Sequence, residues 1–289
     1  MTWIIFAGLS AFFESLKDLI SKRSLTQINP YLVGWSLVLF ALPLLWPLVW
    51  IQGFPSFGDR FMLAMWLGGS INVVAMMLYI KALHLSDLSL TVPLITLTPL
   101  FLLLTSPLIV GEYPTPSDIV GILFIVVGAY CLNLRGSFKS LTAPFVSLWR
   151  DRGSRTMLLV AFMWSFSAVI DKIGVENSSP TFWVVALFTF IAVGMFPIVL
   201  FKCPQPFSTL SKNWKTLAPI GIFQGLAVLV QMQAIQLTLV ARVIAIKRMS
   251  ALFSVLWGGL ILKETGMRDR LFGTSLMVIG VFCLSLWGK

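Results

Sequence analysis

The sequence has few of the side chains that build enzyme active sites and metal centres. Its 289 residues include one histidine and three cysteines, and no two cysteines have the Cys-x-x-Cys spacing of a metal or redox site. Histidine and cysteine are among the side chains on which acid–base and nucleophilic catalysis most often depends. We therefore expect no metal, no cofactor and no catalytic residue, and an enzyme is the least favoured interpretation of the chain.

Charge is equally scarce. Charged residues make up 11% of the chain and hydrophobic residues 58%, whereas a soluble domain is about 25% charged. So few charges cannot cover the surface of a soluble protein, and the main solvent of the chain is expected to be lipid. The net charge of +10 does not indicate a nucleic-acid partner, because the basic residues are spread over short connectors between apolar runs.

Ten apolar stretches come close to the 20 or so residues that a helix needs to cross a bilayer. Continuously apolar runs such as Leu100–Leu104 exclude a transmembrane barrel, whose strands alternate in polarity. The expected fold is an all-α integral membrane protein with ten transmembrane helices. The predicted helices are Trp3–Ser21, Tyr31–Ile51, Phe61–Leu83, Leu90–Val110, Pro116–Leu134, Thr156–Ile173, Phe182–Phe201, Leu217–Leu237, Val240–Leu262 and Leu271–Leu286.

The chain also repeats itself over almost its whole length. The offset is 273 − 121, or 152 residues, in the second part of each half, and 150 upstream of it. Because each half holds five predicted helices, an odd number, the two halves must cross the membrane in opposite orientations. The expected division is a first repeat at 1–135, a linker at 136–155 and a second repeat at 156–289. Matching pairs include Lys22/Lys172, Glu112/Glu264, Gly121/Gly273, Gly128/Gly280 and Cys131/Cys283.

Lys247 and Arg248 lie inside the ninth predicted helix, and no acidic residue is near them in the sequence. An ionised side chain at mid-bilayer costs about 2.5–3.5 kcal/mol, so such residues usually face a cavity or a partner. The leading hypothesis is that the two cations bind an anionic substrate group, a phosphate, sulfonate or carboxylate. Pairing with an acid on another helix and snorkelling to the nearer membrane surface are the alternatives.

Glu14, Lys17 and Asp18 form a second charged group, within the first predicted helix. Their spacing of i, i+3 and i+4 places the lysine between two carboxylates on one helix face. We expect a neutralised triad that is structural or acts as a gate, and a proton-coupling carboxylate is the alternative. Further along, Asp171 and Lys172 are expected to form an interfacial pair.

The third predicted helices of the two halves carry amide side chains, one of the candidates in the first half and two in the second. Asn72 and Gln224 are repeat equivalents, and Gln231 follows two turns later. Amides at this depth bond either a substrate or a neighbouring helix, and contacts between helices are the more frequent use. Asn72, Gln224 and Gln231 are therefore candidate substrate ligands beside Lys247 and Arg248.

The basic residues of the connectors divide unequally between the two membrane faces. Thirteen of them follow predicted helices 1, 5, 7 and 9, and four lie on the opposite face. The excess predicts that the linker is cytoplasmic. The four on the other face are Arg60, Lys172, Arg242 and Lys289.

A set of small and polar positions is shared by the two halves. The first half has Ala82-Leu83, Pro93, Pro99, Glu112, Gly121 and Gly128, and the second has Ala234, Glu264, Gly273 and Gly280, with Ala251 in place of the second proline. With these positions each half resembles the EamA domain of the drug/metabolite transporter superfamily. The resemblance implies two inverted five-helix halves around a central cavity, with alternating access by rocking of helix bundles.

The stretch Ile246-Lys247-Arg248-Met249-Ser250 is more specific. It is similar to the Lys-Arg pair that holds the substrate phosphate on the ninth helix of triose-phosphate translocators. This resemblance implies that Lys247 and Arg248 are anion ligands.

The expected function is a secondary transporter, an exporter or exchanger of a small polar or anionic metabolite, in the cell (inner or plasma) membrane. The expected partners are the lipid bilayer and the small-molecule substrate; a homodimer is left open. The chain has no Walker motif, so an ion gradient or substrate exchange would supply the energy. The alternatives are a non-transporting membrane scaffold or sensor and, much less favoured, an intramembrane enzyme.

Overall fold

The computed structural model describes residues 2–24, 28–86, 88–133, 145–146, 148, 151–260 and 267–286, so the predicted linker lies largely outside it. Every regular element of the described residues is an α-helix. The helices are α1 (Thr2–Ser24), α2 (Pro30–Leu39), α3 (Leu42–Gln52), α4 (Phe61–Leu85), α5 (Leu88–Ile95), α6 (Thr98–Val110), α7 (Pro116–Asn133), α9 (Arg152–Glu176), α10 (Pro180–Lys202), α11 (Pro206–Leu237), α12 (Val240–Lys247), α13 (Ser250–Leu260) and α14 (Met267–Leu286).

Polar caps and prolines mark where several helices begin. Asn29, Asp151 and Ser179 each accept a hydrogen bond from a backbone N–H in the first turn of α2, α9 and α10. These acceptors satisfy N–H groups that have no partner within the helix. Proline fits the first turn because its missing N–H is not needed there. Such prolines are Pro30, Pro180 and Pro206.

Six of the described helical segments are long and apolar enough to cross a membrane, which supports an all-helical integral membrane protein. Two shorter apolar helices, at 116–132 and 272–285, accompany them. The six segments are Pro30–Gln52, Phe61–Leu85, Pro93–Val110, Arg152–Glu176, Pro180–Lys202 and Pro206–Leu237.

The helices of the structure differ from the predicted helices in two ways: three are interrupted and one begins earlier. The second, fourth and ninth predicted helices are each interrupted, at Phe40–Ala41, Thr96–Leu97 and Arg248–Met249. The eighth begins earlier than expected, because α11 starts at Pro206 rather than at Leu217. The residues of α11 before Leu217 are helical but polar. Hydropathy alone therefore did not assign them to the predicted helix.

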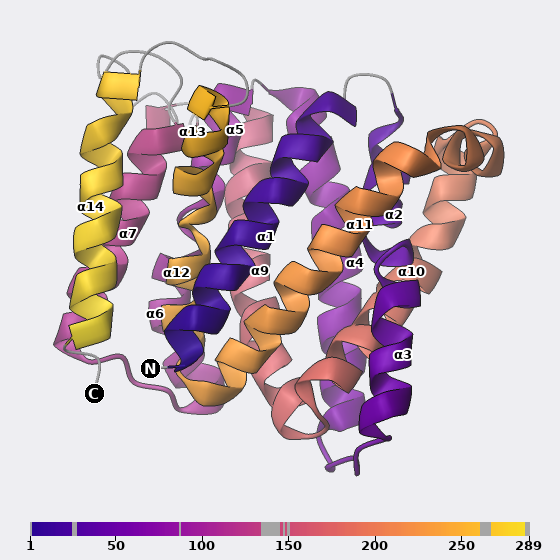
Figure 1. Ribbon diagram of the computed structural model, residues 1–289, viewed down its shortest axis with the longest axis horizontal. Coiled ribbons are helices and arrows are strands. Elements are labelled where there is room, and N and C mark those ends of the chain that lie inside the picture. Colours follow the sequence, from indigo (N-terminus) through magenta and orange to yellow (C-terminus); the bar gives the residue numbers. More distant parts are fainter. Residues whose placement is uncertain are drawn as a thin grey trace.

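The helices pack in pairs that join the two halves of the chain. In Figure 1, α7 lies beside α14 at one end of the molecule, and α1 crosses beside α11; α4 packs against α9 in the same way. Under the repeat, α7 and α14 correspond to each other, and the pair α1–α11 corresponds to the pair α9–α4. The packing thus repeats when the halves are exchanged.

Helix ends gather at two opposite faces of the bundle (Figure 1). We call one of them the lower face: there α1, α7 and α12 begin and α9, α11 and α14 end. The upper face is where α1 and α7 end and α9 and α14 begin.

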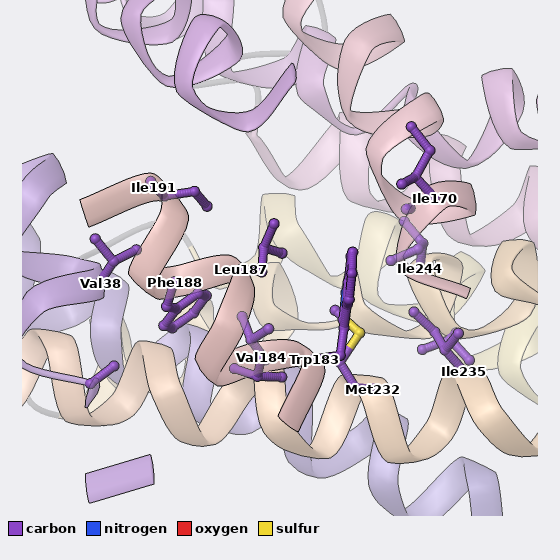
Figure 2. Close-up of a cluster of buried hydrophobic side chains, with 14 of the residues drawn as sticks. Val38, Ile170, Trp183, Val184, Leu187, Phe188, Ile191, Met232, Ile235 and Ile244 are labelled. Carbon is purple, nitrogen blue, oxygen red and sulfur yellow. The ribbon is translucent and has the colours of Figure 1, made fainter. Parts of the chain in front are cut away.

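The main apolar core draws on helices of both halves, and Figure 2 shows the part of it around α10, α11 and α12. Trp183 is fully buried at its centre, and Figure 2 shows it among side chains of all three helices. Such close packing holds α10 against the second-half helices that carry the candidate site. The labelled neighbours are Ile170, Val184, Leu187, Phe188, Met232, Ile235 and Ile244.

Candidate substrate site

Two helices are interrupted at repeat-equivalent positions. The chain leaves the helix at Thr96–Leu97 between α5 and α6, and at Arg248–Met249 between α12 and α13. The offset is again 152 residues (248 − 96). Discontinuous helices at matching positions of two halves commonly form the substrate site of a transporter, because their ends expose backbone groups and side chains to a cavity.

In the first half, proline accounts for the interruption. Pro99 has no N–H, so the carbonyl of Ile95 loses its helical donor, and the hydroxyl of Thr98 donates to that carbonyl instead, at 2.7 Å. The backbone N–H of Leu97 bonds three residues back, to Leu94, at 3.2 Å. The break is therefore one tight turn with its polar groups satisfied locally.

In the second half the same turn forms without proline. The backbone N–H of Arg248 donates to Ala245 at 3.0 Å, and that of Met249 donates to Ile246 at 2.9 Å. Ala251 stands where the first half has Pro99. Lys247 ends α12 and Arg248 caps it, so the two cations lie at the break itself.

Lys247 connects helices from both halves of the chain. Its ammonium donates to Oε1 of Gln231 on α11 at 2.7 Å and lies 3.6 Å from Oε2 of Glu14 on α1. Its side chain is 18% exposed. The sequence shows no acid near Lys247, but the fold brings Glu14 to it, so this cation is partly neutralised rather than unpaired.

The charged face of α1 has the arrangement that its spacing predicts. Lys17 forms ion pairs with Glu14 and with Asp18, the second at 3.3 Å. The Asp18 side chain is 50% exposed, whereas Glu14 and Lys17 are mostly buried. The triad and Lys247 therefore form one charged cluster across α1 and α12.

Arg248 has a hydrogen-bond donor that no described residue accepts. Its Nε is buried and has no hydrogen-bond partner among the described residues, although Glu14 and Asp18 are near enough to interact with the guanidinium electrostatically. Oε2 of Glu14 is also buried without a hydrogen bond, its contact with Lys247 being a longer ion pair. A partly buried guanidinium with a free donor is suited to binding an anion.

The three candidate amides lie in different surroundings. Asn72 donates to Ser167 on α9 at 2.6 Å, which joins α4 to α9, and to the carbonyl of Gly68 within α4 at 2.8 Å. Gln231 accepts from Lys247 and thus belongs to the charged cluster. Gln224 has a buried carbonyl oxygen without a partner among the described residues.

Asp171 and Lys172 do not form the interfacial pair that the sequence suggested. Asp171 is 6% exposed and accepts a hydrogen bond from the indole N–H of Trp183 at 2.9 Å. Lys172 instead pairs with Glu112 at 2.8 Å. Adjacent residues on a helix point about 100° apart, so the two side chains reach different neighbours.

Two further ion pairs between the halves, beyond Glu14–Lys247, were not predicted from the sequence. Besides Lys172–Glu112, Arg242 binds Asp118 through Nε at 2.7 Å and Nη2 at 2.8 Å. Lys172 and Arg242 were counted as connector charges on one membrane face, and the structure corrects this: both are largely buried and paired with acids. Glu264, the repeat equivalent of Glu112, lies outside the described residues.

Asp151 joins α9 to α4 at the upper face. Its carboxylate caps α9 by accepting from the backbone N–H of Ser154 at 2.7 Å, and it accepts from the hydroxyl of Ser86. Burial alone would raise the pKa of this carboxyl, but the hydrogen bonds from Ser86 and Ser154 outweigh burial and lower the pKa to about 2.

No set of three or more histidine, cysteine, aspartate or glutamate side chains within the described ranges is arranged to hold a metal ion. The cluster is instead built of basic, acidic and amide side chains, which can bind a small polar molecule through charge and hydrogen bonds.

Comparison with known proteins agrees with this architecture. No curated protein matches the chain. A crystal structure of a protein that is 15% identical in sequence superposes with a TM-score of 0.78, covering 99% of this chain and 97% of that one, which shows a shared fold. The model of the EamA-like transporter family matches residues 1–134 and again 152–286. The chain therefore belongs to the EamA-like transporter family, a family of membrane transporters, and consists of two EamA repeats.

Proposed function

We propose that this protein is a secondary transporter of a small polar or anionic metabolite, built of ten transmembrane helices in two inverted five-helix repeats. Counting each interrupted helix once, the thirteen described helices would supply the ten crossings of this proposal. The family supports a transporter, and the antiparallel packing of the equivalent helices α7 and α14 supports the inversion. The cell (inner or plasma) membrane remains the proposed location.

The observation that carries the proposal is the position of Lys247 and Arg248 at an interruption that both repeats share. There Arg248 has an unused buried donor, and Lys247 is held by one carboxylate at 3.6 Å and one amide. An incoming carboxylate, phosphate or sulfonate could bind Arg248 and displace Glu14 from Lys247. The anion would thus replace the contact that Lys247 makes with Glu14.

The other candidate residues take secondary roles in this proposal. Gln231 orients the Lys247 ammonium, and the free carbonyl of Gln224 can accept a hydrogen bond from the substrate. Asn72 supports the α4–α9 contact rather than touching the substrate. Glu14, Lys17 and Asp18 form the coupling or gating group, because displacement of Glu14 changes the charge balance beside Lys17.

The test is counterflow in proteoliposomes containing the purified protein. The vesicles are loaded in turn with inorganic phosphate, malate, glutamate, an aromatic sulfonate and glucose phosphate, and uptake of the same radiolabelled compound is measured. Lys247→Gln and Arg248→Gln should abolish uptake of the accepted anion, whereas Lys212→Gln, which removes an exposed cation of α11, should leave it unchanged. Uptake of no probe by the wild type would favour a scaffold or sensor.

Conservative substitutions refine the test. Arg248→Lys keeps the charge but loses the two-point grip of a guanidinium on an anion. Its apparent affinity should fall by about tenfold or more, because a hydrogen bond to a charged group contributes about 1.5–3 kcal/mol. Unchanged affinity in this variant would count against Arg248 as a ligand.

A further inference from the structure

The ion pair between Glu112 and Lys172 lies where helices of both halves converge on the lower face. Glu112 follows α6 after Gly111, whose left-handed backbone (φ 70°) turns the chain out of the helix. Its carboxylate meets the Lys172 ammonium of α9 at 2.8 Å. The pair therefore joins the end of a first-half helix to a second-half helix.

Both side chains of this pair make further contacts. The Lys172 ammonium also donates to the carbonyls of Ile235 and Thr238 at the end of α11, each at 3.0 Å. The Glu112 carboxylate accepts from the backbone N–H of Val240, the first residue of α12, at 2.9 Å, and from the hydroxyl of Ser106 at 2.8 Å. One ion pair thus links α6, α9, α11 and α12 at a single point.

This point lies on the way from the lower face to the candidate substrate site. Val240 begins the helix that ends at Lys247, seven residues later, or about 10 Å at 1.5 Å per residue. Gln231 lies at a similar distance before the end of α11. The helix ends that the pair holds together must separate if a polar molecule is to reach Lys247 from this face.

Exposure distinguishes this pair from its neighbour, Asp118–Arg242. The Lys172 and Glu112 side chains are 12% and 10% exposed, so neither partner is fully buried. Asp118 is fully buried and is held by two bonds from one guanidinium, a geometry suited to a permanent connection between α7 and α12. Arg242 itself is 10% exposed, so the two pairs differ in their carboxylates: a partly exposed carboxylate separates from its cation at lower cost than one that is fully desolvated.

We propose that Glu112 and Lys172 form the gate of the lower face, and that the structure holds this gate closed. The proposal rests on the transport function proposed above and names the contact that regulates access to its site. In a cycle of alternating access, opening to the lower face breaks the Glu112–Lys172 ion pair and frees the ends of α11 and α12.

The test measures water access to the interior and needs no substrate. In a background with Cys131, Cys203 and Cys283 replaced by serine, one reporter cysteine is placed at Thr105 of α6 or at Ile244 of α12, both of which are buried. The labelling rate with a charged, membrane-impermeant thiol reagent is measured in proteoliposomes, together with the melting temperature. The variants are Glu112→Lys, Lys172→Glu, the double charge exchange, and Lys212→Glu as a control on the exposed surface.

Each single charge reversal should raise labelling of at least one reporter by about tenfold or more, the ratio that a hydrogen bond to a charged group can supply. The double exchange should slow labelling again in part, because it restores the ion pair but not the hydrogen bonds that Lys172 donates and Glu112 accepts. Lys212→Glu should not change the rate. Glu112→Gln serves as a milder variant if a reversal does not fold, and it should act in the same direction. Equal labelling in all folded variants, or a double exchange that labels as fast as the single reversals, would overturn the gate.

The outcomes separate this proposal from the transport function. If no probe shows counterflow while labelling still follows the charges at 112 and 172, the transport proposal fails and the gate stands. If counterflow is observed but labelling ignores these charges, the gate proposal alone is refuted.

Discussion

Gly121 of α7 and Gly280 of α14 lie backbone to backbone, each against the carbonyl oxygen of the other. A Cβ atom at Gly121 would lie 2.9 Å from the Gly280 oxygen, and one at Gly280 would lie 2.6 Å from the Gly121 oxygen. Gly128 and Gly273 have the same reciprocal relationship. The earlier glycine of one helix meets the later glycine of the other, so these two equivalent helices run antiparallel. Reciprocal contacts of this kind arise around a twofold axis.

A side chain at this contact should separate α7 from α14. Gly280→Leu would place its Cβ against backbone atoms that cannot move aside, so we expect a loss of about 3 kcal/mol or more, at or above the usual cost of overpacking. Gly8→Leu on α1 is the matched control, because nothing lies within 4 Å of a Cβ there. Melting temperatures in detergent decide the matter: similar values for the two variants would contradict the close contact.

The antiparallel register also predicts that Cys131 and Cys283 form no disulfide within one chain. With Gly128 opposite Gly273, Cys131 lies opposite position 270, which is 13 residues (283 − 270) from Cys283 along α14. At 1.5 Å per residue this is about 20 Å, far beyond the roughly 7 Å Cα separation that a disulfide allows. All three cysteines are free thiols in the structure. Oxidation followed by mass spectrometry checks this, and an intrachain 131–283 bridge would refute the register.

Asp151 makes stability depend on acid pH. Its pKa is lowered to about 2 in the folded protein, below the usual value near 3.9, so its contribution is fully present above about pH 5 and is lost as pH falls toward 2. Asp151→Asn still accepts the cap hydrogen bond but does not titrate. The difference in melting temperature between wild type and this variant should therefore shrink as pH is lowered from 7 to about 3. A difference that stays constant over this range would show that the carboxylate makes no pH-dependent contribution.

Much of the fold could be read from apolar runs and from the repeat. The two EamA copies follow from positions that recur at one offset, and they are confirmed. The repeat did not indicate that the glycines of α7 would meet those of α14. Hydropathy could not reveal the turn at Arg248–Met249, because no proline or glycine marks it. The available signal was Pro99. Because the two halves repeat, the break that Pro99 causes in a first-half helix indicates a break at the equivalent position of the second half.

The ion pairs show why the candidate site was harder to predict. Glu14 and Lys247 are 233 positions apart (247 − 14), and Glu112 and Lys172 belong to different repeats. The periodicity of one helix shows which side chains share its face, as it did for Glu14, Lys17 and Asp18, but not which helix that face meets. For the same reason Lys172 and Arg242 were taken for connector charges.

The orientation in the membrane remains a prediction of the charge count. Lys172 and Arg242 are neutralised by Glu112 and Asp118, so the lower face has even fewer unpaired cations than the sequence suggested. Basic residues concentrate on the cytoplasmic side, so the upper face, with the linker, is expected to be cytoplasmic and α14 to end outside. A fluorescent protein that folds only in the cytoplasm, fused after Lys289, should stay dark. Bright cells would show that the charge count assigns the wrong face to the cytoplasm.

The charged cluster predicts unequal effects for its two sides. Lys247→Gln leaves Glu14 paired with Lys17, so the free energy of unfolding should fall only slightly. Glu14→Gln leaves Lys247 with Gln231 alone, beside Lys17 and Arg248, and should cost about 1–3 kcal/mol because a partly buried cation loses its carboxylate. The double variant removes that stranded cation and should be more stable than Glu14→Gln.

Melting temperatures of the three variants, with Lys212→Gln as control, test the coupling. If the double variant is merely as unstable as the two single losses added together, the Glu14–Lys247 contact contributes nothing. Wild-type stability in Lys247→Gln combined with lost uptake would assign this lysine to the substrate rather than to the fold.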